Sequence, residues 1–107
     1  EAIERAVAPL KNSLIEVFPI AVSRDILRFV HSEEHIDTVY EASEMHRAID
    51  SDTICSENSY AAAAMAVGAG IVAIDGIRSG EFERAFCAVR PPGHHARPEQ
   101  AMGFCLF

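Results

Sequence analysis

One stretch near the end of the chain, residues 90–107, limits what this sequence can fold into. It reads RPPGHHARPEQAMGFCLF and follows a short unbroken apolar run at residues 85–89. Such a run is typical of a strand that is buried on both faces of a parallel sheet. Pro91 and Pro92 end the predicted strand, because proline donates no ladder hydrogen bond and biases the preceding residue toward extended backbone. The sequence therefore predicts an α/β fold whose sheet leads directly into an unusual loop.

Two adjacent histidines lie on this loop. Gly93 permits backbone conformations that other residues avoid, so it can turn the chain sharply before His94 and His95. Open α/β sheets bind their ligands at the carboxyl ends of the strands. The sequence therefore predicts a functional site at the histidine pair.

Three interpretations of the pair are open at this point. Both imidazoles could be structural and bond only to the backbone. Both could hold zinc, although adjacent residues rarely direct two ring nitrogens at one ion, and helical ligand pairs use i, i+4 spacing instead. An acid/base pair fits best, because one neutral imidazole can take a proton from a metal-bound water while its neighbour stabilises the developing charge.

Residues 90–96 (RPPGHHA) and residues 102–107 (MGFCLF) together resemble the histidine-pair region of the zinc-dependent histone deacetylase family. The Pro-Pro form of the turn is similar to that of the class II branch and its bacterial relatives, which include acetylpolyamine amidohydrolases and acetoin-utilisation proteins. The resemblance implies a partial arginase/deacetylase-type three-layer α/β fold, with helices on a mostly parallel sheet that is incomplete in this chain. Residues 1–107 would form the N-terminal part of the catalytic domain, with no internal boundary.

The resemblance also implies a role for each matching residue. His95 corresponds to the general base and acid, which activates the zinc-bound water and later protonates the amine. His94 corresponds to the partner that supplies electrostatic stabilisation. Phe104 corresponds to an aromatic wall of the acetyl-lysine tunnel, with Gly103 and Cys105 beside it near the acetyl group. Judged by residue type alone, core packing is the commoner role for phenylalanine and cysteine.

The zinc ligands of the family are not found in this chain. The family holds Zn²⁺ with an Asp-x-His pair and a further Asp, and a Tyr polarises the substrate carbonyl, all downstream of the matching motif. No Asp-x-His occurs in the 107 residues, so no metal ligand is assigned within this chain. The family fold needs roughly two to three times this length. We therefore expect an N-terminal fragment that is inactive alone and whose parent enzyme binds zinc.

A polar loop at residues 50–53 precedes an Ala-rich segment. Asp52 and Thr53, with Ser59 and Tyr60 after them, are similar to a family segment that leads into a long helix. The resemblance suggests that this loop borders the substrate entrance and that Asp52 contacts the substrate. A turn-forming aspartate is the more ordinary interpretation.

Helical periodicity predicts one helix at the start of the chain and another after this loop. Residues 2–15 form an amphipathic pattern, within which Pro9 must kink the helix or mark its true start. Residues 59–77 are so apolar that we expect a helix buried on most sides, ended by Gly80. The apolar positions of the first pattern and the glycines that permit close approach in the second are Ile3, Val7, Leu10, Leu14, Gly68 and Gly70.

Two further helices are predicted from their caps. Ser23 can cap a helix over residues 24–30, and Ser32 can cap a second one. His31 and His35 stand four apart and could bind a metal on one helix, but Ser32 is expected to break the helix between them. The buried face of the second helix is predicted to hold Ile36, Val39 and Tyr40.

Composition excludes several classes of function. The net charge of -7 argues against direct nucleic-acid binding. An acidic surface can favour lysine-rich tails or polyamines, although an ordinary solvated surface has the same composition. No apolar run reaches the ~18 residues that span a membrane. Three scattered cysteines fit neither a disulfide framework nor a metal knuckle, so we expect a cytoplasmic protein, or a nuclear one in a eukaryote.

The predicted function is zinc-dependent hydrolysis of acetyl-lysine amides to lysine and acetate. One alternative is a related amidohydrolase that acts on acetylpolyamines or another small acetylated compound. A second alternative is a truncated deacetylase-like module that binds partners without chemistry. In each case the exposed apolar surface of an incomplete fold is expected to make the isolated chain self-associate.

Overall fold

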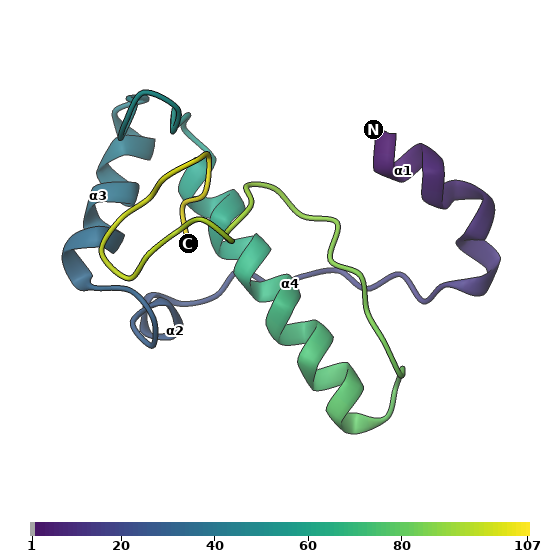
Figure 1. The fold of residues 1–107 in the computed structure, drawn as a ribbon. Helices are drawn as coiled ribbons and strands as arrows, with labels where there is room; N and C mark the ends of the chain where they lie inside the picture. Colours follow the sequence, from purple (N-terminus) through teal and green to yellow (C-terminus); the bar gives the residue numbers. More distant parts are fainter. Residues whose placement is uncertain (1) are drawn as a thin grey trace.

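The computed structural model describes residues 2–107, and its regular elements are helices (Figure 1). The elements in chain order are α1 (Ala2–Val7), the 3-10 helix η1 (Ala8–Ser13), α2 (Arg24–Leu27), α3 (Glu33–Glu44) and α4 (Ser59–Ser79). Over the described residues the β-structure is limited to three isolated antiparallel bridges, Ala48 with Ile54, Arg97 with Gln100, and Met102 with Cys105. The predicted parallel sheet is therefore not formed within this part of the chain.

The prediction of a buried strand at residues 85–89 is wrong for this structure. The segment runs without regular structure back along α4, and Phe86 is 76% exposed (Figure 1). A strand that is buried on both faces needs neighbouring strands for its backbone and a packed layer on each side. None of the described residues supplies such a strand, so the apolar run has no ladder to join.

Helix α3 begins where its cap predicts. The Ser32 hydroxyl accepts a hydrogen bond from the His35 N–H at 3.2 Å, and acidic residues occupy the first turn. Ile36 and Val39 are fully buried, as the pattern predicts. Tyr40 is 46% exposed, so its predicted place on the buried face is wrong. The Tyr40 ring instead packs edge to face against the ring of Tyr60 at the start of α4.

The shorter N-terminal helices differ more from their predictions. The expected helix over residues 2–15 is an α-helical turn followed by η1, with Pro9 in the first turn of η1, and neither element has a buried residue. Helix α2 stops at Leu27 instead of continuing to residue 30, and Ser23 precedes it without a side-chain cap. Arg24 binds Glu33 at 2.7 Å and also Asp37, which ties α2 to α3.

Helix α4 ends as the sequence predicts but is not buried on most sides. Gly80 has φ of 78° and closes the helix with a bond from its N–H to the Ile77 carbonyl. At Gly68 the carbonyl of Ile20 lies where a Cβ would be, so the predicted close approach is confirmed there. Gly70 has no such neighbour. The buried positions of α4 are Ala63, Ala64, Gly68 and Gly76.

The apolar character of α4 also bears on membranes. Over the described residues α4 is the one helix that is long and apolar enough to cross a membrane, with a mean hydropathy of 1.7 over 18 residues. This differs from the expectation that no segment reaches that length. Length and composition do not distinguish a membrane span from the central helix of a water-soluble domain.

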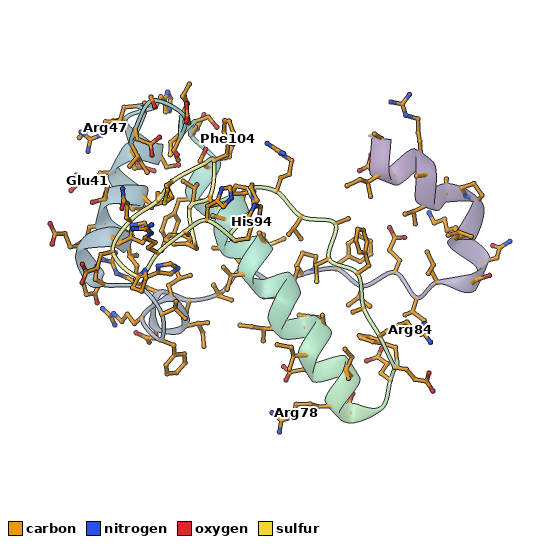
Figure 2. The ribbon with its side chains drawn as sticks, in the orientation of Figure 1. Glu41, Arg47, Arg78, Arg84, His94 and Phe104 are labelled. Atoms are coloured by element: carbon orange, nitrogen blue, oxygen red, sulfur yellow. The ribbon has the colours of Figure 1, made fainter. Side chains whose placement is uncertain are left out.

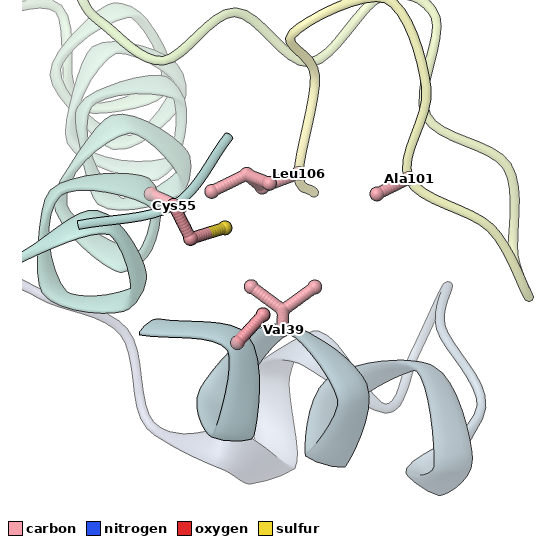
Figure 3. Close-up of a cluster of buried hydrophobic side chains, with 6 residues drawn as sticks. Val39, Cys55, Ala101 and Leu106 are labelled. Carbon is pink, nitrogen blue, oxygen red and sulfur yellow. The ribbon is translucent and has the colours of Figure 1, made fainter. Parts of the chain in front are cut away.

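The core lies between α3, the start of α4 and the last residues of the chain. Figure 3 shows Val39 of α3, Cys55 of the segment that leads into α4, and Ala101 and Leu106 from the end of the chain around one cluster. The residues of the cluster are Val39, Ala42, Cys55, Ala63, Ala101 and Leu106. The segment that follows the histidine pair is therefore anchored in the core.

Candidate active site

The histidine pair lies in a tight turn beside α4 (Figure 2). The Ala96 N–H donates to the Gly93 carbonyl at 3.1 Å and closes the turn. The two imidazoles of His94 and His95 meet edge to face, with ring centroids 4.3 Å apart and planes at 68°. Both side chains are exposed, so neither is a buried structural histidine. Both rings are therefore available to a ligand.

Two of the predicted neighbours hold His95 in place. The His95 N–H donates to the Sγ of Cys105 at 3.3 Å, and Cys105 is fully buried. Gly103 has φ of 58°, and a Cβ at this position would overlap the Nδ1 of His95. The imidazole therefore packs against bare backbone, which only glycine provides here.

Phe104 points away from the core. It has φ of 67° and is 61% exposed, so the commoner core-packing interpretation does not apply to it. Its side chain lines an open hollow of about 300 Å³ together with Thr53, Ser59 and Arg90. Such a left-handed backbone is uncommon for a bulky residue. The Phe104 ring therefore lies at the edge of a hollow next to the histidine turn.

The polar loop reaches the hollow through a different residue from the one predicted. Thr53 and Ile54 line it, whereas Asp52 is exposed and is not part of its wall. Asp50 forms the turn, since its Oδ1 accepts from the N–H groups of Asp52 at 2.9 Å and Thr53 at 2.7 Å. These bonds, the one from Asp52 foremost, lower the pKa of Asp50. A substrate contact by Asp52 stays a prediction.

His35 on α3 and His31, just before that helix, hold the two ends of the loop that follows the histidine pair. The Nδ1 of His31 lies 3.1 Å from the Arg97 carbonyl, and the Nε2 of His35 lies 2.8 Å from the Leu106 carbonyl. A carbonyl only accepts, so Nδ1 of His31 and Nε2 of His35 carry the protons. The two rings are 4.9 Å apart. We call His31 and His35 the loop clamp.

The loop clamp was visible in the sequence only as two histidines flanking a helix cap. Its partners are 66 and 71 residues away, so no local pattern reveals them. Burial lowers the pKa of His35, and the neighbouring His31 lowers it further against the opposing effect of the Leu106 carbonyl. Each ring uses one nitrogen for a backbone carbonyl, which gives both histidines a structural role in holding the loop.

Comparison with known families covers the entire sequence. The profile of the family described as "Histone deacetylase domain" matches residues 1–107. The chain belongs to the histone deacetylase domain family. The resemblance seen in the histidine motif is thereby confirmed over the whole length.

Relatives within the histone deacetylase family include one protein from a plant and one from a bacterium. Histone deacetylase 15 of Arabidopsis thaliana is 40% identical over 86 residues, which is 79% of this chain and 16% of that protein. The histone deacetylase-like amidohydrolase of Pseudomonas aeruginosa is 37% identical over 90 residues, which is 83% of this chain and 23% of that protein. The chain therefore spans less than a quarter of the length of either relative.

A solved structure supports the deacetylase fold. The crystal structure of the HDA15 HD domain matches with a TM-score of 0.90 and 34% identity, covering 98% of this chain and 31% of that one. The helices and connecting segments described above are thus arranged as in part of a larger deacetylase domain. The sheet of the predicted three-layer fold is not formed by residues 2–107.

A group of side chains that could hold a metal ion lies at the histidine turn. Over the described residues one set of three ligand-type side chains converges, His94, His95 and Cys105, with ligand atoms all within 4.8 Å of one another. No carboxylate belongs to the set, and no Asp-x-His occurs in the sequence. The set therefore does not fit the zinc ligands that the family resemblance implies.

Proposed function

We propose that this chain supplies the proton-transfer pair and one wall of the substrate entrance of a zinc-dependent deacetylase. The parent enzyme would hydrolyse acetyl-lysine amides to lysine and acetate. The observation that carries the proposal is the exposed pair of imidazoles, of which His95 is held by Gly103 and Cys105, close to a hollow edged by Phe104. The whole length of the chain matches the deacetylase family.

Amide hydrolysis requires two proton movements that this pair can perform. A base must take a proton from water as its oxygen bonds to the acyl carbon, and an acid must protonate the nitrogen as the C–N bond breaks. We assign both steps to His95, because its backbone and ring are held by Cys105 and Gly103. His94, whose ring meets that of His95 edge to face, would stabilise the charge that develops.

Zinc, when bound by the remainder of the parent protein, would polarise the acyl carbonyl and acidify the water. The residues of this chain would contribute orientation and proton transfer. Phe104 would flank the aliphatic part of the lysine side chain at the edge of the hollow. The net charge of -7 would favour cationic lysine-rich or polyamine substrates.

A second substrate class has its own support. One of the relatives carries the name amidohydrolase, and it matches 83% of this chain. An acetylpolyamine presents the same acetamide on an aliphatic amine, so the pair and the phenylalanine could serve either substrate. We propose an acetyl-lysine peptide as the substrate and an acetylpolyamine as the alternative.

The decisive experiment measures acetate release from an acetyl-lysine peptide and from an acetylpolyamine, with zinc supplied. The protein is the natural reading frame that contains this chain, compared with residues 1–107 alone. We expect activity only in the longer protein. His95→Ala should lower kcat by at least about 100-fold, which is the ordinary contribution of a general acid/base.

The matched control is His46→Asn, since His46 is exposed with φ of 52° and asparagine tolerates that backbone. It should keep kcat within about twofold, in line with a surface change. Full activity of His95→Ala would refute the assigned role. A longer protein that is inert on both substrates would favour the non-catalytic binding module.

Two further properties belong to the proposal. We place the parent protein inside the cell, because Cys55, Cys87 and Cys105 are all free thiols. We also propose that residues 1–107 alone self-associate, since large apolar side chains such as Ile74 on α4 and Phe86 are more than half exposed. Sedimentation velocity that shows a monomer at every concentration would contradict the second statement.

A further inference from the structure

We propose that His94, His95 and Cys105 form a binding site for one thiophilic divalent metal ion, such as Zn²⁺ or Co²⁺. This site is separate from the zinc position that the family resemblance implies. Metal binding itself does not rest on the proposed function. Its consequence, inhibition of proton transfer, does rest on it.

The geometry of the three side chains is close to that of a metal site. Their ligand atoms all lie within 4.8 Å of one another. Zinc bonds of about 2.3 Å to sulfur and about 2.0 Å to nitrogen place tetrahedral ligands roughly 3.5 Å apart. The atoms must therefore approach by about 1 Å, which turning the exposed His94 ring can supply together with a small shift of His95.

The site has two ligands that their surroundings hold, Cys105 and His95, and one adjustable ligand, His94. Cys105 is fully buried, and its Sγ already accepts the His95 N–H. The ring of His94 is exposed and can turn about its side-chain bonds, whereas the exposed ring of His95 packs against Gly103. Two imidazoles and one thiolate are a donor set that zinc uses, with water as the fourth ligand.

The turn explains why adjacent histidines can share an ion here. Successive side chains of a strand point to opposite faces, so an extended backbone would separate the two rings. The hydrogen bond from Ala96 to Gly93 curls the backbone instead, and the ring centroids lie 4.3 Å apart. The general objection to adjacent zinc ligands therefore does not hold at this turn.

Metal binding at this site would exclude proton transfer by the pair. A coordinated imidazole nitrogen uses its lone pair in the metal bond and cannot accept a proton. Excess zinc would therefore compete with the acid/base role of His95, while zinc at the family position would support the reaction. The buried thiol of Cys105 would acquire a role beyond accepting one weak hydrogen bond.

The test titrates residues 1–107 with Co²⁺ under reducing conditions and records the absorption spectrum. Thiolate coordination should give a near-ultraviolet charge-transfer band, together with visible bands of a tetrahedral ion, and one equivalent of Zn²⁺ should remove both. Cys105→Ser should abolish the charge-transfer band. His94→Ala and His95→Ala should each raise the dissociation constant at least tenfold.

Two matched controls keep the result unambiguous. Cys87→Ser removes an exposed thiol outside the set, and His46→Asn removes an exposed imidazole outside it, so both should leave the titration unchanged. Because Cys105 is buried, circular dichroism must show that its variant folds. The two histidine variants change exposed residues and decide the matter if it does not.

The proposal is overturned if no charge-transfer band forms, if the band survives in Cys105→Ser, or if both histidine variants bind Co²⁺ as the unchanged chain does. None of these spectra depends on deacetylase activity. Failure of the metal site is therefore distinguishable from failure of the proposed function. If the longer protein is active but is not inhibited by excess zinc, the metal site stands without its inhibitory consequence, and that part of the inference is wrong.

Discussion

Residues 85–89 and residues 101–106 are close in sequence and comparably apolar, but only the later segment has side chains in the core. Ala101, Cys105 and Leu106 are at most 3% exposed, whereas Phe86 is 76% exposed. The later segment packs on α3 and α4 and is held by the loop clamp. The earlier segment lies along α4 without a strand to pair with.

The difference shows that hydrophobicity predicts burial only where another helix or strand is present for the apolar segment to pack against. Burying a phenylalanine side chain contributes about 1.5–3 kcal/mol, which residue 86 does not gain here. The chain spans 31% of the solved deacetylase domain that it matches. A strand that is buried on both faces depends on elements that the described residues do not include.

The largest expected effect is the difference between the two segments in how much a substitution to alanine lowers the free energy of unfolding. Leu106→Ala should lower the free energy of unfolding by about 2–5 kcal/mol, because it leaves a cavity in the core. Phe86→Ala should change it by less than about 0.5 kcal/mol, as an exposed substitution does. Urea denaturation followed by circular dichroism measures both. Equal effects would mean that the two segments are equally buried in solution.

A smaller effect on the free energy of unfolding is expected at Gly103, whose backbone packs against His95. Gly103→Ala should cost about 1–3 kcal/mol, because its φ of 58° strains an L-residue and its Cβ would displace the His95 ring. The matched control is Gly70→Ala, which has open space and should stabilise α4 by about 0.5–1 kcal/mol. Thermal denaturation and the His95 imidazole signals by nuclear magnetic resonance provide the measurements. Unshifted His95 signals in Gly103→Ala would contradict the packing described here.

The smallest effect concerns the loop clamp and pH. The pKa of His35 is lowered on folding, so the unfolded chain binds more protons and acid favours unfolding. The stabilising contribution is present above the ordinary histidine pKa of about 6.5 and is lost as the pH falls through the lowered value. His31 is the neighbouring titratable group and opposes protonation in the same sense.

Denaturation midpoints at several pH values between about 4 and 8 test this dependence. His35→Gln can still donate a hydrogen bond to the Leu106 carbonyl but cannot titrate, so its stability should vary less over this range. His46→Asn serves as the control for a general loss of one histidine. An unchanged pH dependence in His35→Gln would show that another group is responsible.

Local features of the structure were predictable because their causes lie within a few residues. The Ser32 cap, the end of α4 at Gly80 and the turn at Pro91-Pro92-Gly93 follow from backbone preferences and short hydrogen bonds. The family was predictable because its motif is contiguous. Three features were not predictable: the exposure of Tyr40, the end of α2 at Leu27 and the absence of a strand at residues 85–89. Each of them depends on which elements pack around the segment.

The sequence by itself determined the family, the start of α3, the end of α4 and the position of the two histidines on a loop after an apolar run. Only the tertiary structure decided that Gly103 and Cys105 hold His95, that Phe104 faces a hollow, and that the loop clamp fixes the segment between them. The physical reason is distance along the chain. Caps and turns are set by neighbouring residues, whereas contacts across 66 to 71 residues depend on how the helices pack.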